Sequence, residues 1–268
     1  VVERNPIRAA HLSVCGRTDG KEIAMGSFWE PYPFLAAELQ EVKRLILSQE
    51  ITANAPIRET LRRLVESNGK MLRPGFVLLA SEFGRPESGK VQRIAAAIEM
   101  LHLATLIHDD VIDEAPLRRG LPTLSASFGS RLAVLVGDSL LAACFSLLAD
   151  QLQLDELKGL ARIVRWICGS EIDQSGPRSS VEVSRRRCLR RIAGKTALLF
   201  SLSLYAGGRY GGCPPEVTLR LRRAGYCIGM GFQILDDILD IEGDAAAIGK
   251  PTGKDLALGI ATLPVVYA

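Results

Sequence analysis

The chain has 268 residues, of which 47% are hydrophobic and 24% are charged, and its formal net charge is +3. This composition is typical of a globular protein that is long enough to bury a sizeable core. The small net charge and the aromatic content of 6% argue against a nucleic-acid-binding surface.

Six cysteines lie singly along the chain with no C-x-x-C pair, and only three histidines accompany them. Zinc sites usually show closely spaced ligand pairs, so we do not expect one. No secretory signal is visible at the start of the sequence. We expect a cytoplasmic protein with free thiols, buried or half-buried, at Cys15, Cys144, Cys168, Cys188, Cys213 and Cys227.

Residues 1–24 show no sustained hydrophobic period, and we expect a leader or a poorly ordered segment there. A helical period recurs over residues 25–268, which predicts a single all-α domain. Glycine and proline clusters separate the predicted helices. These helices span about 33–50, 56–67, 72–83, 88–113, 130–152, 155–174, 181–206, 215–242 and 255–268.

The longest apolar run is LAVLVGDSLLAACFSLLA at residues 132–149. It is long enough to raise the question of a membrane span. Asp138 lies in its middle, and Arg131 and Asp150 close its ends. A charged residue in the middle of a span is costly, so we predict a core helix in which Asp138 finds a polar partner.

Two stretches share the pattern Asp-Asp-x-x-Asp within apolar sequence, IHDDVIDE at 107–114 and ILDDILDIE at 234–242. Positions four apart share one face of a helix, so each triplet gathers carboxylates that repel one another. Mg²⁺ prefers carboxylates together with phosphate oxygens and waters. The pattern therefore predicts metal ions held between the two triplets with a diphosphate as the bridge. The alternative is that both triplets are solvated helix ends.

Basic residues flank these triplets and provide candidate partners for a diphosphate. They are Lys70, Arg73, Arg118, Arg119, Lys195, Lys250 and Lys254. His102 precedes the first triplet by about two helical turns, and it is either a core histidine or a neutral donor to a phosphate. The sequence GKT at 194–196 lacks the preceding glycines of a P-loop and falls within a predicted helix.

Six motifs in this order, GKMLRP, HDDVIDEAPLRRGLPT, EIDQ, GKTALLF, FQILDDILD and GKPTGKDL, resemble those of the all-trans polyprenyl diphosphate synthases. The likeness runs from about Phe28 to the end of the chain. It implies an all-α helical bundle of the isoprenoid-synthase type around a deep central cavity. It also implies a magnesium requirement, three Mg²⁺ ions per site when substrate is bound, and usually a homodimer. In the implied reaction, an allylic diphosphate such as farnesyl or geranyl diphosphate ionises and isopentenyl diphosphate attacks the carbocation.

The resemblance also assigns roles by position. It implies metal ligands at Asp109, Asp113 and Asp236, with support from Asp110, Asp237 and Asp240. It implies contacts with isopentenyl diphosphate from Lys70, Arg73, His102 and Arg119. It implies contacts with the allylic substrate from Arg118, Lys195, Thr196, Gln233 and Lys250. The residues closest to the chemistry would be Asp109, Asp110, Asp113, Lys195 and Asp236.

The sequence departs from the family pattern in three places. Asn68-Gly69 replaces a double glycine, Met71 stands in place of an arginine, and Ile260 stands where many short-chain members have a lysine. Family members also continue beyond TLPVVYA with more helices.

Product length is predicted from the residues that precede the first triplet. Short-chain relatives place an aromatic floor near positions where this chain has Leu101, Ala104 and Thr105. One helical turn is about 5.4 Å, close to the length of an isoprene unit. The smaller residues predict a product of roughly C30–C40, with C20 as the alternative.

Three other interpretations remain open. A class I terpene cyclase would share the first triplet, but it needs neither the second triplet nor an isopentenyl diphosphate site. A catalytic subunit of a heteromeric synthase would keep both triplets, as this chain does, whereas a helical scaffold protein would need neither. The basic run SRRRCLRR at 184–191 is a solvated face or attracts anionic lipid headgroups, a peripheral membrane contact where a long product leaves.

Overall fold

The computed structural model describes residues 28–29, 31–66, 69–87, 89–118, 120–175, 184–242, 253 and 262–267. The predicted leader, Cys15, Arg119, Lys250 and Lys254 lie outside these ranges.

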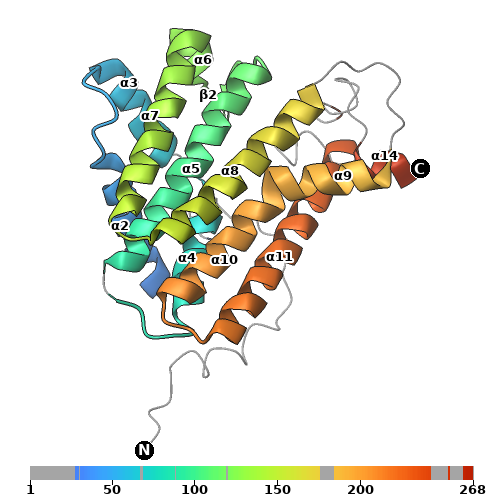
Figure 1. The fold of residues 1–268 in the computed structure, drawn as a ribbon. Helices are drawn as coiled ribbons and strands as arrows, with labels where there is room; N and C mark the ends of the chain where they lie inside the picture. Colours follow the sequence, from blue (N-terminus) through green and yellow to red (C-terminus); the bar gives the residue numbers. More distant parts are fainter. Residues whose placement is uncertain are drawn as a thin grey trace, which may run out of the picture.

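Helices make up nearly all of the described structure (Figure 1). The larger ones are α2 (Pro33–Leu47), α3 (Ala55–Glu66), α4 (Leu72–Ser81), α5 (Lys90–Ile112), α7 (Ser130–Ala149), α8 (Leu154–Ser175), α9 (Arg185–Ile192), α10 (Leu198–Tyr210) and α11 (Pro215–Glu242). The shorter elements are α6 (Leu124–Phe128), α14 (Leu263–Tyr267) and a π-helical segment, η1 (Ala193–Ala197). The prediction of an all-α fold is confirmed.

Helix α5 lies at the centre of the core. It packs against α2, α4, α7 and α10, and most of its residues are buried on every side. A helix that is apolar all round is expected in such a position. Ala95, Ala96 and Ala97 are fully buried in its first half, and their small side chains let neighbouring helices come close. The first aspartate triplet therefore lies at the end of a helix that is packed in the core.

Glycines set the spacing between α10 and its two neighbours, α4 and α11. A Cβ atom added at Gly207 would lie 2.1 Å from the carbonyl oxygen of Val77 in α4. A Cβ atom at Gly225 would lie 2.5 Å from the carbonyl oxygen of Phe200, and one at Gly229 would lie 2.6 Å from the Cα of Ala197. Backbones this close leave no room for a side chain, so α11 is held directly against α10 and η1.

The sequence predicted one helix over 181–206, whereas the structure divides the described part of it into α9, η1 and α10. Ser184 caps α9 through its side chain, which accepts a hydrogen bond from the backbone N–H of Arg187. A π-helical turn inserts an extra residue into a helix, and such turns are frequent at functional sites. Here the wide turn brings Gly194 so close to α8 that an added Cβ would lie 2.2 Å from Ser170 Oγ.

The other predicted helices agree with the structure to within a few residues. The structure adds the short α6 and a small hairpin, in which β1 (Leu117–Arg118) pairs antiparallel with β2 (Leu121–Pro122). Of the helix predicted at 255–268, residues 263–267 are helical, and residues 254–261 and 268 lie outside the described ranges.

Helix α7 has the longest apolar run, and among the described helices it alone is long and apolar enough to cross a membrane. About 33% of that stretch is buried inside the protein. One face packs on the core through residues such as Val136, Leu140 and Leu148, whereas Leu132 and Leu135 are exposed. The prediction of a core helix therefore holds for one face of α7.

The predicted burial of the thiols is partly wrong. Cys144 and Cys188 are buried and Cys213 is half-buried, but Cys168 and Cys227 are exposed on the outer surfaces of α8 and α11. All five are free thiols. Cys168 follows the buried Ile167, whereas both neighbours of Cys227, Tyr226 and Ile228, are exposed.

Replacing Gly207 with alanine tests the close contact between α10 and α4. We expect Gly207→Ala to lower the free energy of unfolding by about 1–3 kcal/mol, because the added methyl group would overlap the backbone of Val77. Chemical denaturation followed by circular dichroism would measure the change. Gly169→Ala in α8 is the matched control, since an added Cβ there meets nothing within 4 Å. If Gly207→Ala changed the free energy of unfolding no more unfavourably than Gly169→Ala, the proposed packing would be contradicted.

Candidate active site

The first triplet lies where α5 ends. Asp113 follows the last helical residue, and its N–H donates to the carbonyl oxygen of Asp109 at 2.8 Å. Asp113 is exposed, Asp109 is half-buried, and the side chain of Asp110 is buried, with 5% of the residue exposed. The three residues therefore range from buried to exposed across the helix end.

The buried Asp110 is held by Arg118. Arg118 Nε donates to both carboxylate oxygens of Asp110, at 2.8 and 2.9 Å, and Nη2 lies 2.7 Å from Oδ1. The β1–β2 hairpin, which the sequence did not predict, places Arg118 beside the helix end. The two residues were predicted to support a metal and to contact the allylic substrate. Here they form an ion pair with each other, and those roles remain predictions.

The carboxylate of Asp109 is affected by charged groups from three other segments. Burial raises the pKa of its carboxyl group to about 6, and the nearby carboxylate of Glu171 adds to this rise. Lys195 of η1 and Arg118 act in the opposite direction. Glu171 is the first residue of the motif EIDQ, to which the sequence analysis gave no residue role. Its position in α8 opposite Asp109 could not be seen without the fold.

The second triplet lies at the end of α11 and repeats the arrangement of the first. Its middle residue, Asp237, is buried, with 4% of the residue exposed. Gln233 Nε2 donates to Asp237 Oδ1 at 2.9 Å, and Thr196 Oγ1 donates to Gln233 Oε1 at 2.6 Å. Burial raises the pKa of Asp237, against the effects of Gln233, Arg191 and Lys195. This chain of hydrogen bonds joins α11 to η1.

The outer carboxylates of the second triplet are less enclosed. Asp236 is exposed and Asp240 is half-buried. The backbone N–H of Gly253 donates to the carbonyl oxygen of Asp240 at 2.7 Å. The motif GKPTGKDL therefore returns to the end of α11 at this residue.

Lys195 of η1 is an exposed cation whose charge acts on one residue of each triplet. Its positive charge acts on both Asp109 and Asp237, and the C-terminal ends of α5 and α11 point toward the same end of the bundle (Figure 1). The sequence predicted that the triplets face each other, and this arrangement remains a prediction. The π-helical turn around Lys195 positions this charge.

Arg73 and His102, both predicted to contact isopentenyl diphosphate, lie together. Arg73 Nη1 is 2.8 Å from His102 Nε2, and its guanidinium group lies over the ring of Phe200 at 5.0 Å. Arginine has no acceptor atom, so Nε2 must accept and the imidazole is neutral. Lys70 is exposed, and its carbonyl oxygen accepts a hydrogen bond from Trp29 Nε1 at 2.7 Å.

The predicted product-length residues occupy the same face of α5. Leu101 and Ala104 are buried in the core, and Thr105 is half-buried. Thr105 Oγ1 donates to the carbonyl oxygen of His102 at 2.8 Å. Of the three, Thr105 is therefore the position where a larger side chain can be accommodated most easily.

The described residues could bind Mg²⁺ only together with further ligands from substrate or water. No three histidine, cysteine or acidic side chains within the described ranges lie close enough to share one ion. Asp237 Oδ2 is nevertheless buried without a hydrogen-bond partner, and Asp109 is costly to ionise. These carboxylates could bind Mg²⁺ if substrate oxygens and waters supplied the remaining ligands.

Asp109→Asn should stabilise the metal-free protein. Because the pKa of Asp109 is raised in the folded state, ionising it makes the folded state less stable as the pH rises from about 4 to about 6. At pH 7 without metal we expect a gain of up to about 3 kcal/mol in unfolding free energy, and little gain at pH 4. Urea unfolding in a chelator would measure both values. Asp113→Asn, at an exposed position, is the control and should change stability little. Equal effects of the two substitutions would contradict this account.

The motifs and geometry agree with comparisons to known proteins. The family model "Polyprenyl synthetase" matches residues 54–268. Component 2 of the heptaprenyl diphosphate synthase of Geobacillus stearothermophilus is 39% identical over 237 residues, which cover 88% of this chain and 74% of the relative.

Solved structures show the same likeness. A geranylgeranyl pyrophosphate synthase from Lactobacillus brevis is 36% identical, with a TM-score of 0.81 over 89% of this chain and 75% of that chain. A polyprenyl synthase from Caulobacter crescentus, complexed with calcium and isoprenyl diphosphate, is 33% identical, with a TM-score of 0.80 over 92% of this chain and 74% of that chain. The chain thus belongs to the polyprenyl synthetase family, as its ordered motifs predicted.

Proposed function

We propose that the protein is a Mg²⁺-dependent trans-prenyltransferase that condenses isopentenyl diphosphate with an allylic diphosphate. The observation that carries this proposal is that two aspartate-rich helix ends lie toward the same end of the bundle (Figure 1), where the charge of Lys195 acts on a carboxylate of each. Membership of the polyprenyl synthetase family supports the same reaction. The allylic substrate is farnesyl or geranyl diphosphate.

Carboxylates whose negative charge is not balanced by a neighbouring side chain are suited to bind a metal ion. Asp109, Asp113 and Asp236 would bind Mg²⁺ with support from Asp110, Asp237 and Asp240, although Arg118 also binds Asp110 and Gln233 also binds Asp237 Oδ1. When bound, Mg²⁺ offsets the negative charge of a diphosphate. A site with three ions is our proposal, and the Caulobacter structure with calcium and isoprenyl diphosphate supports divalent metal in this fold.

Fixed positive charge assists ionisation of the allylic substrate. As the carbon–oxygen bond breaks, negative charge builds up on the leaving diphosphate, and cations aimed at that charge lower the barrier. Lys195, whose charge acts on both triplets, is suited to this role. Thr196 and Gln233 would also contact the allylic substrate, and their side chains hydrogen-bond to each other. Lys250, in the predicted loop after the second triplet, is proposed as a further contact.

The second substrate requires its own set of donors. Arg73, His102 and Lys70 would bind isopentenyl diphosphate, together with Arg119. The contact between Arg73 and a neutral His102 orients the guanidinium group. The ring of Phe200 covers its other side. A partly buried guanidinium group of this kind favours two parallel hydrogen bonds to a phosphate.

We propose a product of roughly C30–C40. Small side chains on α5 before Asp109 support it, as does the likeness to a heptaprenyl diphosphate synthase component. The Lactobacillus geranylgeranyl pyrophosphate synthase is comparably similar, so C20 is the alternative product.

We propose a homodimer in the cytoplasm as the working form. The free thiols of the described chain support a reducing compartment. The name "component 2" of the Geobacillus relative supports a second candidate, in which this chain is the catalytic subunit of a heteromeric synthase. Light scattering and activity assays of the purified chain would distinguish the two.

The reaction is tested with purified protein, Mg²⁺, labelled isopentenyl diphosphate and farnesyl diphosphate, followed by sizing of the extracted products. We expect elongation to C30–C40. Asp236→Asn should lower kcat by about 10²–10³-fold, because an outer carboxylate near the leaving diphosphate is lost. Asp150→Asn, at the end of α7, is the control and should leave kcat unchanged. Full activity of Asp236→Asn would contradict the proposal.

Thr105→Phe tests the direction in which the product grows. A phenyl ring at this half-buried position should shorten the main product by at least one isoprene unit, while the rate of the first condensation changes little. Thr105→Ser keeps the hydroxyl group that donates to His102 and should give products of normal length. Chromatography of the dephosphorylated products measures both. If Thr105→Phe made products of unchanged length, the residues that limit chain length would lie elsewhere.

A further inference from the structure

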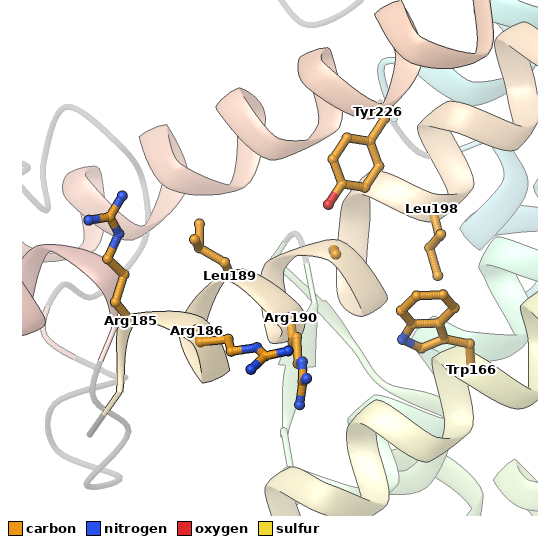
Figure 2. Close-up of a pocket in the computed structure, with 8 residues that line it drawn as sticks. Trp166, Arg185, Arg186, Leu189, Arg190, Leu198 and Tyr226 are labelled. Carbon is orange, nitrogen blue, oxygen red and sulfur yellow. The ribbon is translucent and has the colours of Figure 1, made fainter. Parts of the chain in front are cut away.

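A second binding feature lies outside the aspartate site, on the surface between α8, α9 and α11 (Figure 2). It is a groove of about 530 Å³. Its lining residues are Trp166, Arg185, Arg186, Leu189, Arg190, Ala193, Leu198 and Tyr226. None of the residues assigned to the diphosphate and metal site lines it, so the groove needs its own explanation.

The groove is strongly basic on one side. Five of the eight residues of α9 are arginines, and Arg186 and Arg190 are four positions apart. Figure 2 shows their guanidinium groups side by side below α9. Like charges at this spacing destabilise a helix by a few tenths of a kcal/mol. A ligand with negative charge would relieve the repulsion.

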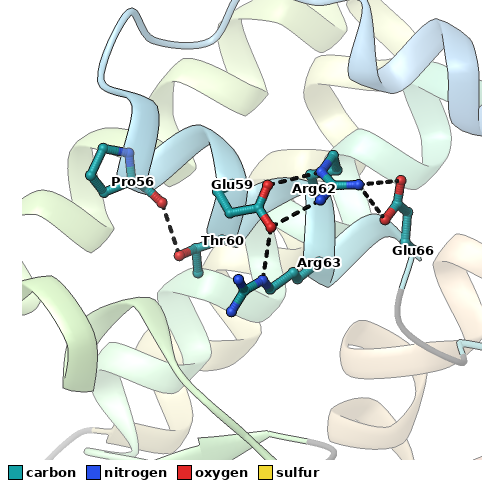
Figure 3. Close-up of polar contacts among 6 residues, drawn as sticks. All are labelled: Pro56, Glu59, Thr60, Arg62, Arg63 and Glu66. Atoms are coloured by element: carbon teal, nitrogen blue, oxygen red, sulfur yellow. Dashed lines mark hydrogen bonds and ion pairs between the residues drawn. The ribbon is translucent and has the colours of Figure 1, made fainter.

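The arginines of α3 show the contrast. Arg62 and Arg63 also lie close together, but Glu59 pairs with both, at 2.9 Å each, and Glu66 pairs with Arg62 at 3.2 Å (Figure 3). Across the described residues no carboxylate forms an ion pair with Arg186 or Arg190. The charge on α3 is therefore balanced within the fold, whereas the charge in the groove is available to a ligand.

The other side of the groove is aromatic and apolar. Trp166 of α8 is 56% exposed and Tyr226 of α11 is 40% exposed, large values for such side chains. The indole N–H of Trp166 points toward Arg190, and the hydroxyl group of Tyr226 points toward the groove (Figure 2). Tryptophan, tyrosine and arginine are the residues that favour the boundary between lipid headgroups and acyl chains.

We propose that this groove docks the protein on a membrane surface by binding the phosphate headgroup of an anionic phospholipid. Arg186 and Arg190 bind the phosphate, since paired guanidinium groups match its oxygens. Trp166, Leu189 and Leu198 contact the start of the acyl chains. The inference rests on the proposed function in one respect, because a long apolar product partitions from water into lipid.

Vesicle flotation tests the proposal with the full chain. Vesicles of phosphatidylcholine with phosphatidylglycerol should bind the protein, and vesicles of phosphatidylcholine alone should not. Arg186→Gln with Arg190→Gln should weaken binding by roughly thirtyfold, the effect expected of two basic residues at an anionic surface. The control, Arg62→Gln with Arg63→Gln, changes the net charge equally at a balanced site and should bind nearly as well as the wild type. Equal losses of vesicle binding in both variants would contradict the proposal and indicate that binding depends only on net charge.

Tryptophan fluorescence gives a second measurement at the groove itself. The chain has two tryptophans, and Trp29 is buried whereas Trp166 is exposed. Anionic vesicles should shift the emission to shorter wavelength and protect Trp166 from acrylamide quenching, and Trp166→Phe should abolish both changes. Protection by inorganic diphosphate without any effect of vesicles would overturn the proposal and indicate a site for free anions.

Synthase activity separates this inference from the proposed function. The Arg186→Gln/Arg190→Gln variant should elongate farnesyl diphosphate at the wild-type rate in detergent solution, since neither residue belongs to the site around Lys195. Vesicle binding by a wild-type protein that makes no product would refute the proposed function alone. Normal synthesis with no vesicle binding would refute the docking groove alone.

Discussion

Repulsion among the aspartate carboxylates at the ends of α5 and α11 is the constraint around which the site is organised. The structure treats the middle aspartate of each triplet in the same way. Asp110 is buried and held by Arg118, and Asp237 is buried and held by Gln233. The flanking aspartates are more exposed. The middle carboxylate of each triplet is thus held by a neighbouring side chain, while the flanking carboxylates and Asp237 Oδ2 remain for a cation.

Close packing makes this arrangement possible. Asp237 is reached from η1 only because Gly225 and Gly229 let α11 lie directly on α10 and η1. The π-helical turn then carries Lys195, whose charge acts on both triplets, and presents Thr196 to Gln233. Side chains at Gly225 and Gly229 would push α11 away from α10 and η1. Lys195 would then act less strongly on the carboxylates of α11. Packing between helices therefore sets the electrostatics of the site.

Much of the fold could be predicted from the sequence, because helical periodicity and glycine or proline breaks are local signals. The aspartate triplets were recognisable for the same reason. The π-helical turn was not, since AGKTA continues the apolar pattern of its neighbours. The role of Arg118 toward Asp110 depends on a short hairpin, and the effect of Glu171 on Asp109 depends on where the fold places α8. Contacts between distant segments leave no local pattern, and these were the features that the sequence could not supply.

The central claim is that the outer carboxylates and a diphosphate bind Mg²⁺ jointly. Isothermal titration calorimetry with Mg²⁺ in the presence and absence of inorganic diphosphate tests it most directly. Since the described carboxylates do not form a complete cage, we expect weak binding of Mg²⁺ alone and at least tenfold tighter binding with diphosphate, a coupling of about 1.4 kcal/mol or more. The coupling should disappear in Asp109→Asn. Tight binding of Mg²⁺ that is independent of diphosphate would contradict the account.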